Sequence, residues 1–304
     1  MLLLLLTSFS CASLKNPERP GVPSTDEGYF IKSGTGYKLF IYEYRPIENY
    51  KSTIYIISGI TGINHRAEKE IIILLSNNEN RVVVIHPRGT GYSEGMRGDI
   101  SDFSDFVNDH IEIIKRDKDY NSRLHKTVLF GHSMSTAILL AVAGKLKNVG
   151  GAILVNPPHI LKKARGMSPG FCEYIKYAWF YLFSRHKPIV NMAGNPSAMV
   201  DEEDRNESMA RMNDSLLVKY FSIYMMMESK RIMDSMAVFA KTADYPLLLI
   251  HGDRDNIADI KGCDLIYDAW KCERKQYKII KNGSHGKSTV LLSGDFIHQW
   301  LNYL

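Results

Sequence analysis

The sequence predicts an α/β protein with a mostly parallel, doubly wound sheet, an N-terminal antiparallel hairpin and an inserted helical cap. Three observations support this prediction. Short apolar runs rich in β-branched residues alternate with amphipathic helical patterns, as in parallel sheets whose strands are buried on both faces. A stretch of different composition, residues 156–244, interrupts the alternation and holds 10 of the 13 methionines. The chain of 304 residues, 45% of them hydrophobic, is long enough for one large core with such an insertion.

The first 28 residues are expected to form a hydrophobic N-terminus followed by a polar tether. The run MLLLLL is too short to span a bilayer. Its continuation resembles the end of a bacterial lipoprotein signal that stops at Cys11. Two features depart from such a signal: no Lys or Arg precedes the leucines, and Ser8 takes a position that usually holds Leu. Two alternatives follow, a lipoprotein anchored to the membrane through Cys11 and a cytoplasmic protein with a hydrophobic N-terminus.

The core is expected in two parts, residues 29–157 and 244–304, separated by the helical cap at 158–243. The pattern YFIKSGTGYKLFIYEY predicts a hairpin around a glycine-rich turn. Short apolar runs after the hairpin predict the parallel strands; they are TIYII (53–57), RVVVI (81–85), TVLF (127–130), AILV (152–155), PLLLI (246–250) and YKII (277–280).

The net charge and the cysteine content argue against a nucleic-acid-binding protein and against a structural metal site. The net charge of +5 is modest and the Lys and Arg residues are scattered, so we expect no binding to nucleic acid. Weak attraction to an anionic membrane surface stays open. The four cysteines show neither CxxC spacing nor a zinc-type cluster with histidines, so we predict no structural metal. Cys263 and Cys272 are expected on one helix, roughly 13 Å apart, which is too far for a disulfide and predicts free thiols.

Polar side chains that can carry hydrolytic chemistry follow three of the predicted strands. TVLF ends in GHSMS with Ser133, PLLLI ends in HGDRDNIAD with Asp255, and YKII ends in KNGSHGKS with His285. In doubly wound sheets, active residues lie at the carboxyl ends of strands. Hydrolases built on such sheets use catalytic residues in the order Ser, Asp, His along the chain. A serine hydroxyl cannot attack an ester unaided, so His285 must accept its proton while a carboxylate fixes the imidazole tautomer. Asp253 is the alternative acid, but it falls two residues early and is expected to brace the turn.

The negative charge that develops during such a reaction needs two backbone donors. One is expected to be the N–H of Met134, directly after the nucleophile. The other is expected from the loop after TIYIISG, where Ile60 is best placed.

The chain resembles the monoglyceride lipase and lysophospholipase branch of the α/β hydrolase superfamily, which includes serine aminopeptidase-like hydrolases. The resemblance runs from about residue 30 to the C-terminus and rests on four motifs in the right order: RGTGYSEGMRG, SDFSDFVNDH, GHSMS and GDRDNIADIKG. It implies the α/β hydrolase fold and hydrolysis of carboxylic esters of single-acyl lipids, such as a monoacylglycerol or a lysophospholipid, through an acyl-enzyme intermediate. It also implies a mobile cap and no cofactor.

Three residues depart from the pattern of this family. Ser58 replaces the usual histidine before the oxyanion glycine, and His86 replaces an aspartate before the RG motif. Ser135 replaces the second glycine of the GxSxG elbow. Because the oxyanion donors are backbone groups, the first change need not abolish activity. The third adds only a CH2OH group and is expected to cost about 1 kcal/mol of crowding or strain.

Other interpretations stay open beside the lipid esterase. The same fold supports a serine aminopeptidase or a small-ester hydrolase, and a non-catalytic protein that binds lipid or a partner is also compatible with the sequence. His65, His110 and His132 are expected to be structural. The aromatic and methionine-rich stretches FCEYIKYAWFYLF and YFSIYMMMES fit either an acyl-chain gate or ordinary helix packing.

Overall fold

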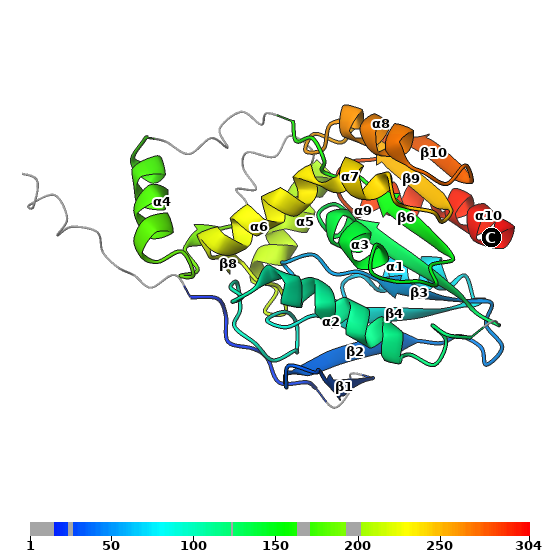
Figure 1. Cartoon of the computed structure of the whole chain (residues 1–304), viewed down its shortest axis with the longest axis horizontal. Helices are drawn as coiled ribbons and strands as arrows, with labels where there is room; N and C mark the ends of the chain where they lie inside the picture. Colours follow the sequence, from blue (N-terminus) through cyan, green and yellow to red (C-terminus); the bar gives the residue numbers. More distant parts are fainter. Residues whose placement is uncertain (1–14, 24–26, 123, 163–170, 193–201) are drawn as a thin grey trace, which may run out of the picture.

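The computed structural model describes residues 15–23, 27–122, 124–162, 171–192 and 202–304. A central sheet lies between two layers of helices, and a helical region inserted after the sixth strand extends to one side (Figure 1). This architecture confirms the predicted fold class. The predictions for Cys11 and the leucine run fall outside the described residues.

The sheet has eight strands in the order β1-β2-β4-β3-β5-β6-β9-β10. The first two strands form the predicted hairpin, and β2 pairs antiparallel with β4, whereas all other neighbours are parallel. The strands are β1 (Gly28–Lys32), β2 (Lys38–Tyr44), β3 (Ser52–Ile56), β4 (Asn80–His86), β5 (Lys126–His132), β6 (Gly151–Val155), β9 (Leu247–Gly252) and β10 (Lys275–Ile280).

Two hydrophobic cores fill the space between the sheet and its helices. Every residue of β3, β4 and β6 is buried, because alternate side chains of each strand enter opposite cores. In β3, for example, Tyr55 belongs to one core, whereas Ile54 and Ile56 belong to the other. One face is covered by α2 (Phe103–Arg116), α3 (Ser135–Ala143), α7 (Met236–Ala240) and α8 (Ile260–Ala269), and the other by α1 (Lys69–Ser76), α9 (Lys287–Leu292) and α10 (Gly294–Tyr303).

The helix expected to carry both Cys263 and Cys272 is shorter than predicted. α8 ends at Ala269, because Trp270 adopts an extended backbone and buries its indole, which donates a hydrogen bond to the Tyr245 carbonyl at 2.9 Å. Cys272 therefore lies in the connection to β10. Both cysteines are free thiols, as predicted.

The inserted region contains α4 (Phe171–Phe183), β7 (Val190–Asn191), α5 (Glu202–Asn213), β8 (Tyr220–Phe221) and α6 (Ile223–Asp234). The short strands β7 and β8 pair antiparallel, and α6 packs on α3 of the core. Figure 1 shows α4 standing apart from the sheet, at the left of the view. Within the described ranges, no helix is both long and apolar enough to cross a membrane. The elements occupy the region expected for the cap, whose boundaries at 158 and 243 remain a prediction.

Candidate active site

The carboxyl ends of β3 and β5 form the crevice in which doubly wound sheets bind their ligands. β3 pairs with β4 on one side and with β5 on the other, so the order of strands reverses at this point. The loop after β3 contains Ile60, and the turn after β5 contains Ser133. The fold therefore brings two of the predicted site elements to one edge of the sheet.

Ser133 lies on a strained turn between β5 and α3. Its φ angle is 55°, in the left-handed region that a non-glycine residue rarely adopts. The turn is held because the Ser133 N–H donates to the Val155 carbonyl at 2.9 Å and the Ser133 carbonyl accepts from the Thr136 N–H at 3.0 Å. Gly131 allows the close approach of strand and helix, since a Cβ there would lie 3.1 Å from backbone atoms of Ser135 and Thr136. These contacts present the serine hydroxyl at the start of the helix.

The three predicted catalytic side chains form one hydrogen-bonded chain. Ser133 Oγ lies 2.7 Å from His285 Nε2, and His285 Nδ1 lies 2.8 Å from Asp255 Oδ2. The second carboxylate oxygen, Asp255 Oδ1, accepts hydrogen bonds from the N–H groups of Ile257 and Ala258, each at 2.8 Å. The Asp255 side chain is fully buried. Nucleophile, base and acid thus meet at the distances that proton transfer requires.

Electrostatics favours the charged form of the acid. Burial opposes ionisation of Asp255, but its hydrogen bonds with His285 and with two backbone N–H groups outweigh burial and lower the pKa of the carboxyl. An ionised Asp255 accepts a hydrogen bond from the His285 Nδ1–H, and this tautomer leaves Nε2 free to accept the Ser133 proton. Asp253 has an exposed side chain, and it joins the turn through its N–H, which donates to the Ile280 carbonyl at 3.0 Å. The geometry therefore favours Asp255 over Asp253.

The loop after β3 forms a tight turn, residues 59–62, that we call the oxyanion turn. The Gly62 N–H donates to the Gly59 carbonyl at 2.9 Å, so the N–H of Ile60 is not used to close the turn. Within the part of the chain that the structure describes, the N–H groups of Ile60 and Met134 have no hydrogen-bond acceptor. Two backbone donors are thus free on either side of the elbow, although Ile60 itself is buried.

Ser58 directly precedes the oxyanion turn and is fixed by hydrogen bonds to β4 and to His110. The Ser58 hydroxyl donates to the Ile85 carbonyl at 2.6 Å, and the Ser58 N–H donates to His110 Nε2 at 3.2 Å. Burial lowers the pKa of His110 to about 4, so the ring is neutral and its Nδ1–H donates to the Phe106 carbonyl. The position where the family usually carries histidine is therefore occupied by a serine whose side chain bonds to the sheet.

Two residues hold the loop that carries His285: His132, which was expected to be structural, and Asn156, which the sequence analysis did not single out. The His132 Nε2–H donates to the His285 carbonyl at 2.7 Å. Asn156 Nδ2 donates to the carbonyls of Ser284 and His285, at 3.0 and 3.2 Å, and Asn156 Oδ1 accepts from the Gly252 N–H at 2.9 Å. Burial and the neighbouring His285 lower the pKa of His132 to about 4, so this ring is also neutral.

A positional signal for Asn156 was present in the sequence. Asn156 directly follows the strand AILV, at the edge of the sheet where the strands have their carboxyl ends and where the triad is predicted. Its φ angle of 49° suits asparagine, which tolerates the left-handed region. His132 also lies at this edge, directly before Ser133, but its position does not reveal its partner, the His285 carbonyl.

Comparison with known proteins identifies the family. A family model described as serine aminopeptidase, S33, matches residues 48–287. The chain belongs to this family of hydrolases. It is 26% identical to the monoglyceride lipase of Rattus norvegicus over 273 residues, which cover 87% of this chain and 84% of the rat protein.

Solved structures support the α/β hydrolase fold of this serine aminopeptidase family member. A soluble variant of monoglyceride lipase from Saccharomyces cerevisiae, in complex with a substrate analog, has a TM-score of 0.76 at 17% identity and covers 94% of this chain and 98% of its own. The monoacylglycerol lipase of Paleococcus ferrophilus has a TM-score of 0.64 at 17% identity, with 87% and 97% covered. The resemblance to the monoglyceride lipase branch is thereby confirmed.

The departures of this hydrolase from the family pattern have local explanations. His86 is buried at the end of β4, and its Nδ1 accepts the Tyr92 N–H at 3.3 Å, as an aspartate oxygen could. Ser135 Oγ accepts the His132 N–H at 2.7 Å and donates to the His132 carbonyl at 2.9 Å. Even a Cβ on the neighbouring Gly59 would lie 4.0 Å from the Ser135 Cβ, an ordinary contact distance, so Ser135 is not crowded from this side. The serine thus braces the elbow, where we had expected mild crowding.

We expect Ser135→Gly to keep kcat/KM within about threefold, because Ser135 bonds to the backbone and not to the reacting hydroxyl. Loss of two hydrogen bonds should lower the free energy of unfolding by about 1–2 kcal/mol. Steady-state kinetics and thermal unfolding measure the two effects. Ser135→Ala, which keeps the Cβ, separates crowding from hydrogen bonding. A hundredfold loss of activity in either variant would show that Ser135 takes part in the chemistry.

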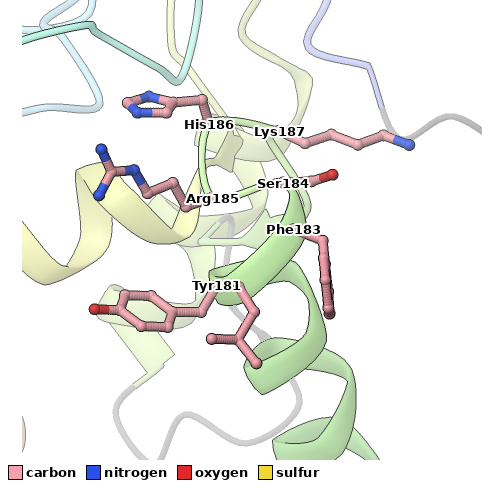
Figure 2. A pocket seen from close by; sticks show the side chains of 7 residues that line it. Tyr181, Phe183, Ser184, Arg185, His186 and Lys187 are labelled. Carbon is pink, nitrogen blue, oxygen red and sulfur yellow. The ribbon is translucent and has the colours of Figure 1, made fainter.

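No metal site and no second catalytic cluster emerge from the described residues. Among them, no group of three or more His, Cys, Asp or Glu side chains could hold a metal ion. A shallow hollow lies at the end of α4, where the side chains fan outward from the helix end (Figure 2). It is lined by Tyr181, Leu182, Phe183, Ser184, Arg185, His186 and Lys187. No triad residue lines it, so the hollow is not the candidate active site.

Proposed function

We propose that the protein is a serine hydrolase that cleaves carboxylic esters of single-acyl lipids, such as a monoacylglycerol or a lysophospholipid. The observation that carries this proposal is the chain of hydrogen bonds from Ser133 through His285 to the buried Asp255. The similarity to the rat monoglyceride lipase supports a lipid ester as the substrate class. The reaction requires no cofactor, since the three side chains supply nucleophile, base and acid.

In the proposed mechanism, Ser133 Oγ attacks the ester carbonyl while His285 Nε2 takes the hydroxyl proton. The N–H groups of Met134 and Ile60 stabilise the negative oxygen of the tetrahedral intermediate. The intermediate collapses, the alcohol leaves with the proton from His285, and the acyl group stays on Ser133 as an ester. A water molecule then repeats the sequence, which releases the fatty acid and restores the serine hydroxyl.

A serine aminopeptidase is the second candidate, because the family description names that activity. Such an enzyme needs an acidic side chain to bind the substrate ammonium group. Glu207 of α5 is an acidic residue whose charge acts on His132, but it already accepts the Lys287 N–H at 3.2 Å and lies 3.8 Å from Arg211 Nε. Because Glu207 is already engaged by these two groups, it is poorly suited to bind a substrate ammonium group. This observation favours the lipid esterase over the aminopeptidase.

Acyl chain length tests the substrate class. Each buried methylene contributes about 0.8 kcal/mol, so lengthening the acyl chain of a monoacylglycerol from about four to ten carbons could supply ~5 kcal/mol, of which about half should remain after chain ordering. We therefore expect kcat/KM to rise by about one to two decades across the series. Lysophospholipids and aminoacyl amides are assayed beside it. A maximum at two to four carbons, or preference for the amides, would contradict the lipid esterase.

We further propose that α4 contacts the lipid surface from which the substrate comes. Its large apolar side chains are exposed: Ile175 and Trp179 by 55%, Phe183 by 65% and Leu182 by 70%. Trp179 and Phe183 pack against each other with ring centroids 4.3 Å apart. Aromatic and aliphatic side chains on one helix, followed by basic residues such as Lys187, are typical of helices that lie in a membrane interface.

Binding to lipid vesicles checks this contact. The double variant Leu182→Glu/Phe183→Glu should weaken co-sedimentation with vesicles of phosphatidylcholine and phosphatidylglycerol by at least about tenfold, since two apolar groups become charged. Leu124→Glu is the matched control, because Leu124 is 85% exposed but precedes β5, at the opposite edge of the sheet from Ser133. Equal binding of the double variant and the control would contradict the proposed contact.

A further inference from the structure

The N-terminal arm, residues 15–22, is docked on the molecule by Arg19, which donates to the Gly95 carbonyl at 2.8 Å, and by four hydrogen bonds of Asn16. Asn16 Oδ1 accepts the N–H groups of Lys219 and Tyr220, at 2.9 and 2.8 Å. Asn16 Nδ2 donates to the carbonyls of Tyr220 and Arg97, at 2.7 and 2.9 Å. The amide thus uses both acceptor sites and both donor protons, all of them on backbone groups. A segment that composition suggested to be a polar tether is therefore a structural part of the fold.

Asn16 joins two segments that flank the active site. One is the cap segment, residues 214–222, which contains β8; the other is the loop after β4. The two segments also bond directly, since the Ser222 N–H donates to the Gly98 carbonyl at 2.8 Å. Arg97 reaches across the junction, and its guanidinium donates to the carbonyls of Ser215 and Leu217 at 2.8 and 2.9 Å. The arm therefore completes a junction between cap and core.

The junction is tightly fitted at Gly98. A Cβ at this position would lie 1.9 Å from the Tyr220 carbonyl oxygen and 2.7 Å from Asn16 Nδ2. The φ angle of Gly98 is 83°, which also favours glycine. Only a residue without a side chain lets Asn16 and β8 approach the loop so closely. The local sequence of the core is thus matched to the presence of the arm.

The cap segment continues from this junction to the oxyanion turn. The Val218 N–H donates to the Thr61 carbonyl at 2.9 Å, and Thr61 is the residue that follows Ile60 in the turn. Val218 in turn precedes Lys219, the first residue that Asn16 binds. A short run of backbone therefore connects the Asn16 amide to the Thr61–Gly62 peptide, two peptides after the one that carries the Ile60 N–H.

We propose that Asn16 is a positioning residue for hydrolysis: by fixing the cap segment, it holds the oxyanion turn in the position where the Ile60 N–H meets the tetrahedral intermediate. The proposal rests on the function proposed above, in which Ile60 is an oxyanion donor. Asn16 lies outside residues 48–287, the range that matches the family model, so the arm adds a support that the matched region does not contain.

The test compares Asn16→Ala with wild type in the full chain. Active sites are first counted with a fluorophosphonate probe, so that each rate refers to folded, reactive enzyme. We expect kcat for a ten-carbon monoacylglycerol to fall by about tenfold, less than removal of an oxyanion donor would cause, while KM stays within about twofold. An alkyl boronic acid, which forms a tetrahedral adduct on Ser133, should bind about tenfold more weakly. Glu18→Ala is the matched control, because Glu18 is an exposed arm residue.

The outcomes separate this inference from the function it rests on. If Asn16→Ala lowers the melting temperature but keeps kcat per titrated site and boronic acid affinity, the side chain is only structural and the inference is wrong. If wild type neither reacts with the probe nor hydrolyses esters, the proposed function fails and the inference fails with it. Should Asn16→Ala not yield folded protein, Asn16→Gln, which keeps both polar groups one methylene further out, is judged by the same criteria.

Discussion

Ser133→Ala and His285→Ala are each expected to reduce kcat for a monoacylglycerol by about 10⁶, the largest effect of any substitution proposed for this protein. The reason is the 2.7 Å contact between Ser133 Oγ and His285 Nε2, which lets the ring take the hydroxyl proton as the nucleophile attacks. Removing either partner removes the nucleophile or its base. The residual rate should reflect only the oxyanion donors and substrate binding.

The two aspartates of the HGDRD motif provide a matched pair for the same experiment. Asp255→Asn should reduce kcat by about 10⁴, because an amide cannot stabilise the imidazolium and favours the wrong tautomer of His285. Asp253→Asn should have little effect, since the Asp253 side chain is exposed. If Asp253 proves the more sensitive position, the assignment of the acid is wrong.

Covalent labelling distinguishes an enzyme from a non-catalytic member of the family. A fluorophosphonate reacts with an activated serine, so wild type should be labelled and Ser133→Ala should not. Asp255→Asn should label slowly. Persistent labelling of Ser133→Ala would move the nucleophile to another residue, and unlabelled wild type would favour a protein that only binds lipid or a partner.

Asn156→Ala is expected to reduce kcat/KM by about 10², because displacement of a catalytic group by roughly 1 Å has an effect of this size. The Asn156 amide holds the carbonyls of Ser284 and His285 and the Gly252 N–H, and thereby the loop that aims the catalytic ring. The buried Gly252 N–H would lose its partner, whereas the His285 carbonyl keeps its bond from His132 and the Ser284 carbonyl keeps its bond from Thr289. The free energy of unfolding should therefore fall by roughly 1–3 kcal/mol.

Asn78→Ala controls for the backbone conformation of this variant. Asn78 has a φ angle of 54°, close to the 49° of Asn156, but its side chain is exposed. Both variants introduce alanine into the left-handed region, at a cost of about 1 kcal/mol each. Only Asn156→Ala should alter kcat/KM and the rate of probe labelling. Equal kinetics in the two variants would show that Asn156 has no part in positioning His285.

The fold was largely predictable from local patterns. The strand runs and the hairpin follow from periodicity, because burial on one or both faces imposes a regular spacing of apolar residues. The predicted C-terminus of the helix that was expected to reach Cys272 was wrong. The helix stops at Ala269 because burial of Trp270 against Tyr245 outweighs the local helical pattern. Such a contact cannot be read from the spacing of residues.

The candidate site was predictable to the extent that it follows the ends of strands. Ser133, Asp255 and His285 were found because parallel strands bring their carboxyl ends to one edge of the sheet. Asp255 was preferred as the acid because Asp253 falls two residues early in the turn. The structure supports this preference, since Asp255 is buried and Asp253 is exposed. By contrast, the two hydrogen bonds of Ser135 to His132 could not be predicted, since they depend on the path of the elbow.

The sequence by itself determined the fold class, the three side chains of the candidate triad and their order along the chain. These features are encoded in local periodicity and in position at strand ends. Only the tertiary structure decided what holds that triad and its oxyanion turn in place. Asn156 meets His285, and Asn16 meets Tyr220 across 204 residues of chain. Contacts of this kind depend on which segments the completed fold brings together, so a local pattern can mark a position such as Asn156 but cannot give its partners.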